Sequence, residues 1–435
     1  MDRERPERVA ARRGRYQQRL SLDAITASVL ASVPALPPVD RPIAECLGCV
    51  LATPVVAPAD VPPWPVATRD GYAVRAADVI APRSAGAVRL KVVGEARAET
   101  LPRSLAAGSA LRVMTGAPVP RGADTVVPAE WCRPGSAGAT ADWVDIVRES
   151  EPGQYVAGTG TEFGAGAAAL SAGTVLGPPE LAVLAALGQG DVRVLPRPRV
   201  AIIATGSELS WRAGPSHAGR LYPSNVALVQ AMVTACGGAV SAVRVTSDDE
   251  HDVAAGLRDA LGSDLVLTTG GTGRSSRDVV GTVLLEQETD SLWNAPVRGS
   301  KAAPFRLLRH AETGRSVPHL ALPGRPIAAM TAFIAFAYPL LRHLAGLPAI
   351  PPRHRWARLA GDVAGTPGRH RYIPVRLERR GTVLEAVPAG EASLYGLAAT
   401  AGTDGFAVVG RRAGWLEKGR RVRVLIPPWC PDKAL

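Results

Sequence analysis

The middle of the chain alternates short apolar runs with glycine-containing loops and with stretches of helical periodicity. Runs that predict strands lie at Arg199–Ala204, Ala239–Val245, Asp264–Thr268 and His319–Leu322. Strand–loop–helix units in series predict a parallel sheet covered by helices on both faces. We therefore expect residues 191–348 to form a three-layer α/β domain with a mostly parallel sheet. Such domains bind ligands at the carboxyl ends of their strands.

The segments on either side of this domain have a different pattern. Residues 49–150 and 349–435 contain short β-forming runs between proline and glycine turns, which predicts two small β-domains. Helices are expected near residues 22–33 and 179–188, and residues 1–18 are a polar tail. A chain of 435 residues exceeds one ordinary core, so two to four domains are expected. The predicted fold class is multidomain α+β.

Four loops follow the predicted strands of the α/β domain and carry its candidate chemistry. They are Thr205-Gly206-Ser207-Glu208, Asp248-Asp249, Thr269 to Gly273, and Pro323 to Pro326. Glycines let backbone N–H groups approach an anion closely, and helix N-termini add positive potential. We predict that these loops hold a small phosphorylated molecule. The alternative is that the glycines only make tight turns.

Three carboxylates have both a chemical and a structural interpretation. Asp248 has the chemistry of a ligand for a metal that holds phosphate oxygens, but it also stands with Asp249 where helix N-caps belong. Glu180 heads a predicted helix, where a carboxylate also stabilises the helix dipole. Asp70 precedes Gly71, and an Asp-Gly pair is common in β-turns.

Net charge and cysteine content restrict the environment and the partners. The formal charge is +11 and the pI is about 9.9, yet the chain is rich in arginine and poor in lysine, which also fits a general composition bias. No basic block with interleaved aromatic residues occurs, so nucleic acid is not an expected partner. The five cysteines fit a reducing cytoplasm, and Cys46 and Cys49 are interpreted as small residues on one helical face.

A membrane location is not expected from the hydrophobic pattern. The first 19 residues are charged throughout and lack the apolar core of a signal peptide. The longest apolar run, Ile327–Leu341, is about one turn too short to span a bilayer comfortably. We therefore expect this run to be a buried helix of the α/β domain.

Several collinear segments over about residues 20–430 resemble one family, the molybdopterin molybdenumtransferases, which include the E domain of gephyrin. The closest match is residues 111–130, LRVMTGAPVPRGADTVVPAE. The others are D-G-Y-A-V at 70–74, RVAIIATGSEL at 199–209, Y-x-x-N at 222–225 and L-P-G-x-P at 322–326. The resemblance implies an elongated dimerisation domain (19–48 with 151–190), an inserted β-domain (49–150), the α/β domain and a C-terminal β-barrel. It also implies a homodimer whose active site combines one subunit's α/β domain with the other's D-G-Y-A region.

The implied reaction inserts molybdate into adenylated molybdopterin and releases AMP and water, with Mg²⁺ as cofactor. By position, the resemblance implies catalytic roles for Asp70, Thr115 and Asp248, and metal binding by Glu180 and Asp248. Handover of the product to molybdoenzymes is a further implied partnership. The expected substrate-binding residues are Gly206, Ser207, Gly270, Gly271, Thr272, Gly273, Arg274, Arg298, Lys301, Pro323, Gly324, Arg325, Pro326 and Ser393.

The chain departs from the family pattern at charged positions. Where the family usually has an arginine, this chain has Ala157, and where it usually has two lysines, this chain has Asn294 and Arg298. In contrast, arginines appear at positions 69, 274 and 325. Our hypothesis is that these arginines supply anion-binding charge from different loops. Two alternatives are a non-catalytic carrier or scaffold for molybdopterin, and an adenylyltransferase, which the T-G-G-T-G loop at 269–273 resembles. The sequence leaves open molybdate versus tungstate, the recipient enzyme and any role of Cys46 and Cys49.

Overall fold

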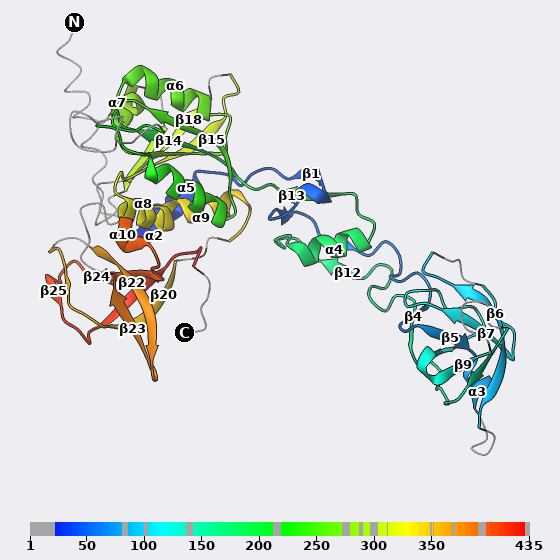
Figure 1. Cartoon of the computed structure of the whole chain (residues 1–435). Helices are drawn as coiled ribbons and strands as arrows, with labels where there is room; N and C mark the ends of the chain where they lie inside the picture. The colour runs from blue at the N-terminus through cyan, green and yellow to red at the C-terminus, as the bar shows by residue number, and fades with distance from the viewer. Residues whose placement is uncertain are drawn as a thin grey trace, which may run out of the picture. The chain divides into compact units, whose positions relative to one another are not determined.

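The computed structural model (Figure 1) describes residues 22–80, 86–99, 103–135, 142–211, 219–271, 279–286, 290–295, 303–310, 312–348, 350, 352–367, 370–389 and 397–430. The chain divides into two compact units. The first contains Met1–Val39, Gly48–Val50 and Leu195–Leu435, and the second contains Asp40–Leu47 and Leu51–Val194.

A six-stranded sheet dominates the second unit, as the β-type pattern predicts. Its order is β8-β5-β7-β6-β10-β9. The strands are β5 (Gly71–Val74), β6 (Val88–Ala96), β7 (Ser109–Val113), β8 (Thr125–Pro128), β9 (Cys132–Pro134) and β10 (Trp143–Ile146), with helices α3 (Ala76–Val79) and η2 (Ala129–Trp131) between them. Alternate residues enter separate clusters, Ala73 with Leu111 and Tyr72 with Val127. The sheet therefore has an apolar core on each face.

Short pairings link distant parts of the chain. Strand β3 (Val55–Val56) pairs with β12 (Ala168–Leu170), and β4 (Val66–Ala67) pairs with β11 (Val156–Ala157). A three-stranded sheet, β1-β13-β2, joins Val39–Pro42, Asp191–Leu195 and Val50–Leu51. The helices are η1 (Ile43–Glu45) and α4 (Pro178–Ala186). Segments about 90 to 150 residues apart in the sequence thus pair with one another.

Cys46 and Cys49 do not share a helical face, so that interpretation was wrong. Helix η1 ends at Glu45, and both cysteines are buried in the segment that follows it. The Cys46 thiol donates to the Pro42 carbonyl at 3.2 Å. A single 3-10 turn is too short to carry both residues, because 3-10 runs seldom extend beyond a few residues.

The α/β domain lies in the first unit and contains a six-stranded sheet in the order β15-β14-β16-β19-β18-β17. The strands are β14 (Arg199–Thr205), β15 (Ala239–Thr246), β16 (Leu265–Thr269), β17 (Asp290–Ala295), β18 (Ala303–Arg309) and β19 (Ser316–Leu322). The four predicted strands are parallel, which confirms that part of the expectation. The antiparallel hairpin β17–β18 was not predicted, because proline and glycine interrupt its sequence and no helix follows β17.

Helices cover both faces of this sheet (Figure 1). Helices α2 (Leu22–Ala31) and α5 (Ser224–Ala235) pack on one face, and α6 (Glu250–Ala260) and α7 (Val279–Glu286) pack on the other. Strand β14 serves both layers, because Ile202 enters one core cluster and Ile203 the other. A strand buried on both faces is apolar at every position, which explains its continuous hydrophobic run.

The long apolar segment is the core helix that the sequence predicts. It comprises α8 (Pro326–Ala332), a π-helical segment η3 (Phe333–Ala337) and α9 (Tyr338–Leu344). Pro326–Leu344 is long and apolar enough to cross a membrane, but 67% of its most apolar window is buried inside the protein. Phe333 and Ile334 are fully buried against the sheet and helix α2. Protein contacts therefore account for its hydrophobicity.

The C-terminal segment forms the expected closed barrel. Its order is β20-β23-β22-β24-β26, formed by Arg353–Leu359, Val383–Pro388, Arg371–Arg380, Gly405–Val409 and Arg421–Ile426. A separate pair joins β21 (Val363–Ala364) to β25 (Trp415–Leu416), and α10 spans Leu397–Thr400. The interior is filled by alternate apolar residues such as Val375 and Val424. Closure removes the exposed strand edges that an open sheet would present.

A buried histidine makes the α/β domain sensitive to acid. His319 on β19 is fully buried, and its Nε2 lies 3.0 Å from the Thr268 hydroxyl. Burial, and secondarily the charge of Arg306 on β18, lower the pKa of His319 to about 3. The unfolded chain binds this proton near pH 6.5 and the folded chain does not. Stability is therefore complete above pH 6.5 and falls as the pH drops from 6.5 toward 3.

We expect this histidine to cost about 2 kcal/mol of stability between pH 6.5 and pH 5, since each pH unit contributes about 1.4 kcal/mol. Thermal unfolding of wild type and His319→Gln at pH 7.5 and 5.0 measures the effect. The wild type should lose more stability than the variant on acidification. The carboxylates titrate in both proteins, so only His319 can make the two losses differ. Equal losses of stability would therefore contradict the assignment.

Candidate functional site

Three strand-end loops of the α/β domain meet through their backbones. A Cβ atom added to Gly270 after β16 would lie 2.4 Å from the Thr205 carbonyl oxygen at the end of β14. A Cβ added to Gly324 after β19 would lie 3.7 Å from the Gly270 Cα. Gly270 and Gly271 have φ angles of +87° and +61°, which side-chain-bearing residues rarely adopt. These positions therefore require glycine for both conformation and space.

Asn225 ties two of these loops together. Its Nδ2 donates to the Thr269 hydroxyl at 3.0 Å and to the Gly324 carbonyl at 2.8 Å. Its Oδ1 is buried and has no hydrogen-bond partner among the residues that the structure describes. Asn225 does not cap α5, because the helix begins at Ser224 with Pro223 as its N-cap. The side chain reaches across to the neighbouring loops instead.

We predict that Asn225→Ala loosens these loops without disturbing the sheet. The variant loses two hydrogen bonds worth about 1 kcal/mol each, so amide hydrogen exchange at residues 269–271 and 324–325 should accelerate about tenfold or more. Thr234→Ala, at an exposed position of the same helix, is the control. Equal exchange in Asn225→Ala and wild type would show that the side chain does not hold the loops.

The two adjacent aspartates after β15 have different partners. The Asp248 carboxylate accepts from the Ser207 N–H at 2.9 Å, and the Asp248 N–H donates to the Ser207 hydroxyl at 3.0 Å. The Asp249 carboxylate accepts from the N–H groups of His251 and Asp252 at 2.9 and 3.0 Å. Asp249 is thus the N-cap of α6, while Asp248 joins the loops after β14 and β15.

The loop after β19 places one exposed cation beside this group. Pro323 and Pro326 are buried, and Pro326 begins α8 at a position that favours proline. Gly324 and Arg325 between them are exposed. Arg325 therefore stands at a helix N-terminus next to the meeting point of the loops, where anions are favoured.

Six predicted site residues lie outside the described residues, and their roles stay predictions. They are Thr272, Gly273, Arg274, Arg298, Lys301 and Ser393.

Glu180 serves as a helix cap. Its Oε2 accepts from the Gly177 N–H at 2.9 Å at the start of α4. Within the described ranges, no group of three or more His, Cys, Asp or Glu side chains is arranged to hold a metal. Mg²⁺ sites often use one or two carboxylates together with water and phosphate oxygens. A single carboxylate such as that of Asp248 is therefore compatible with such a site. The metal-binding roles of Glu180 and Asp248 stay predictions.

In the second unit, Asp70 and Thr115 contact each other although they are 45 residues apart. The Asp70 Oδ1 accepts from the Thr115 hydroxyl and from its N–H, both at 2.7 Å. These hydrogen bonds lower the pKa of Asp70 below its usual range, and the bond from the Thr115 hydroxyl has the largest effect. The charge of Arg112 also lowers this pKa. A Cβ on Gly71 would lie 2.0 Å from the Val127 carbonyl oxygen, so strand packing requires glycine at position 71. Asp70 is therefore a fixed, ionised carboxylate at the start of β5.

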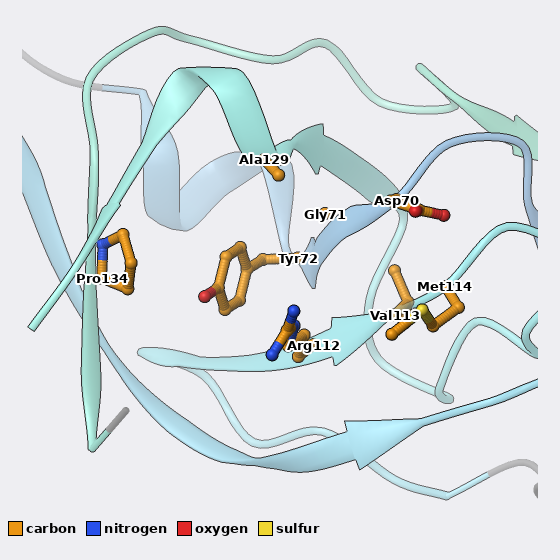
Figure 2. A pocket seen from close by; sticks show the side chains of 8 residues that line it. All are labelled: Asp70, Gly71, Tyr72, Arg112, Val113, Met114, Ala129 and Pro134. Atoms are coloured by element: carbon orange, nitrogen blue, oxygen red, sulfur yellow. The ribbon is translucent and has the colours of Figure 1, made fainter. Parts of the chain in front are cut away.

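A small hollow of about 160 Å³ opens beside Asp70 (Figure 2). Figure 2 shows Tyr72 and Arg112 extending toward each other from opposite positions of β5 and β7. Neither residue was predicted as a site candidate, although both lie within segments that carry the family resemblance, 70–74 and 111–130. The lining residues are Asp70, Gly71, Tyr72, Arg112, Val113, Met114, Ala129 and Pro134.

Comparison with protein families matches three models along the chain. The MoeA N-terminal region (domain I and II) matches residues 20–188. The probable molybdopterin binding domain matches residues 201–343, which include all the strand-end loops. The MoeA C-terminal region (domain IV) matches residues 356–426.

Individual relatives agree with these matches. Molybdopterin molybdenumtransferase 2 of Mycobacterium tuberculosis is 33% identical over 378 residues, covering 84% of this chain and 90% of the relative. Molybdopterin molybdenumtransferase 1 of the same organism is 31% identical over 379 residues, covering 82% and 86%. The crystal structure of a molybdopterin biosynthesis MoeA protein from Pyrococcus horikoshii superposes with a TM-score of 0.69 at 28% identity, covering 94% of this chain and 99% of that chain.

Proposed function

Because the chain belongs to the molybdopterin molybdenumtransferase (MoeA) family, we propose that it inserts molybdenum from molybdate into adenylated molybdopterin and releases AMP. The observation that carries the proposal is the meeting of three strand-end loops around Gly270, with Asn225 and the Asp248–Ser207 pair holding them. Family members act in molybdenum cofactor biosynthesis, and this site suits their polyanionic substrate.

The residues of the loops suit a substrate that carries a pyrophosphate. Backbone N–H groups at glycine-rich loops and the N-termini of α6 and α8 stabilise negative charge without side-chain rearrangement. Mg²⁺ bound at Asp248 would neutralise phosphate charge as the bond to AMP breaks. Arg325 extends the positive field at the start of α8. The dithiolene sulfurs of the substrate are the ligands that take up molybdenum.

We propose the four-domain division expected from the sequence and a homodimer in which Asp70 and Thr115 of one protomer complete the site of the other. The two hydrogen bonds from Thr115 hold the Asp70 carboxylate in one position, which would suit a group that must meet a substrate in fixed geometry. The finished cofactor would pass to molybdoenzymes in the cytoplasm.

Release of AMP tests the proposed reaction. The purified full chain is incubated with adenylated molybdopterin, molybdate and Mg²⁺, and AMP is quantified over time. Binding without AMP release would identify a carrier instead. Consumption of ATP with free molybdopterin would identify an adenylyltransferase.

Mixing two inactive variants tests the shared site. Asp70→Ala and Asp248→Ala each lose one half of every site in a homodimer, but a mixed dimer contains one site with both halves intact. When the two variants are mixed and their subunits exchange, half of the dimers are mixed. Each mixed dimer has one intact site out of two, so the mixture should regain up to about a quarter of wild-type activity. No recovery, with mixed dimers demonstrated by mass spectrometry, would refute the shared site.

A further inference from the structure

Helix α6 contacts the loop that carries Asp248. The Asp252 Oδ2 accepts from the Ser247 N–H at 2.8 Å and from the Ser247 hydroxyl at 3.0 Å. Asp252 lies in the first turn of α6, so its side chain reaches back past the start of the helix. Ser247 directly precedes Asp248 in the chain. The two hydrogen bonds therefore hold the backbone immediately before the proposed catalytic carboxylate.

These bonds differ from the ordinary cap of a helix. In a capping box, the side chain at the third helical position accepts from the N–H of the N-cap residue. Asp252 occupies that position, but it accepts from Ser247, two residues before the N-cap Asp249. The Asp249 carboxylate itself accepts from the N–H groups of His251 and Asp252. The helix is thus capped by Asp249, and the Asp252 carboxylate fixes the loop.

Arg244 on β15 fixes the other oxygen of Asp252. Its Nη2 lies 3.0 Å from the Asp252 Oδ1, and its Nη1 pairs with Asp259 further along α6. A Cβ added to Gly256 would lie 3.3 Å from the Arg244 Cδ, so glycine lets the helix approach this side chain closely. The Ser247 N–H makes the largest contribution to lowering the pKa of Asp252, and Arg244 adds to it. The carboxylate is therefore charged at neutral pH and held at both oxygens.

The position of Asp248 depends on contacts of its loop. The paired register of β14 and β15 ends at Thr205 and Thr246, whose hydroxyls are 3.1 Å apart. Asp248 lies two residues beyond this pair, outside the ladder of the sheet. On one side it bonds to Ser207, through its carboxylate and its N–H. On the other side it follows Ser247, which α6 holds.

We propose that Asp252 is a positioning residue for Asp248, and that it acts by fixing Ser247. The inference rests on the proposed function, in which the Asp248 carboxylate serves the cleavage that releases AMP. A catalytic group is effective only when it is held in the geometry that the reaction needs. Both oxygens of Asp252 are engaged by Ser247 and Arg244, so Asp252 acts through its neighbours and not on the substrate.

The first test compares three aspartates of the same region in the full-length protein. Asp252→Ala should lower kcat/KM for AMP release about ten- to a hundredfold, because small displacements of a catalytic group lower the rate steeply. Asp259→Ala is the matched control, since it also removes an ion pair of Arg244. Asp249→Ala controls for the stability of the helix start. Neither control residue bonds to Ser247, so both variants should keep kcat/KM near the wild-type value. Equal losses in all three variants would overturn the proposal.

A double-mutant cycle separates positioning from a general loss of structure. If Asp252 acts only through Asp248, Asp252→Ala should change kcat/KM by no more than about twofold in the Asp248→Ala background. A separate structural role would multiply the two losses, and that result would overturn the proposal. Single-turnover reactions with excess enzyme measure the low rates of these variants.

Amide hydrogen exchange tests the positioning without turnover. The Ser207 N–H donates to the Asp248 carboxylate and lies on a different loop from Asp252. Asp252→Ala should accelerate exchange at Ser207 about tenfold, whereas Asp259→Ala should leave it unchanged. Faster exchange in Asp252→Ala without AMP release by wild type would support the positioning and refute the proposed reaction. Unchanged exchange at Ser207 would overturn the positioning role, whether or not the wild type releases AMP.

Discussion

Asp248→Ala is expected to lower kcat/KM for AMP release by a factor of about 10² to 10³ while the protein stays folded. Loss of a single preorganised group at a phosphoryl or acyl centre has effects of this size. Asp248 is partly exposed and its hydrogen bonds are to Ser207, so no core contact is lost. Steady-state kinetics and thermal unfolding of the variant measure the two effects separately.

The neighbouring aspartate provides the control. Asp249→Ala removes the N-cap of α6, which costs about 1 kcal/mol of stability, and should leave kcat/KM near the wild-type value. Asp248→Asn keeps an acceptor for the Ser207 N–H but removes the charge. If Asp248→Asn retains full activity, the carboxylate serves only to position the loop. If Asp249→Ala is as inactive as Asp248→Ala, neither assignment stands.

Gly270→Ala is expected to abolish substrate binding and to destabilise the α/β domain. A left-handed φ alone costs an alanine about 1–2 kcal/mol. At Gly270 the new Cβ would in addition lie 2.4 Å from the Thr205 carbonyl oxygen, so the two loops must separate. Since the same loops are proposed to bind the substrate, we expect affinity to fall more than a hundredfold. Calorimetric binding and thermal unfolding measure both consequences.

Gly237→Ala isolates the contribution of the close contact. Gly237 has nearly the same φ, +88° against +87°, but a Cβ there meets no atom within 4 Å. This variant should lose about 1–2 kcal/mol and bind substrate normally. Equal destabilisation of the two variants would mean that φ strain alone explains Gly270 and that the loops do not need their close approach.

Local sequence patterns predicted most of the fold, because each of those strands and helices is specified by residues close together in the sequence. The continuous apolar run of β14 and the glycine that follows it reflect burial on both faces and a turn, and both are visible within ten residues. The barrel strands and the core helix were predicted for the same reason. Hairpin β17–β18 was missed, since an antiparallel pair with proline and glycine between its strands carries no strand–loop–helix signal.

The family resemblance extended the prediction from elements to individual residues. It singled out Asp70 and Thr115 within motifs that local periodicity does not distinguish, and it implied a catalytic role for Asp248, which the strand-end loops had already made a candidate. It did not single out Arg112 or Tyr72, although both lie inside those motifs and line the hollow. Arg69 was noted only as a departure from the family, and its contact with Tyr155 was not anticipated.

By itself the sequence determined the fold class, the glycine-rich strand ends, the family and the residue types available for anion chemistry, because these depend on local periodicity, turn chemistry and motif spacing. Only the tertiary structure decided which of two adjacent aspartates caps a helix and which joins two loops. It likewise decided that Asn225 bridges partners 44 and 99 residues away. Such contacts form between segments distant in sequence, so packing of the whole sheet selects them and no local pattern encodes them.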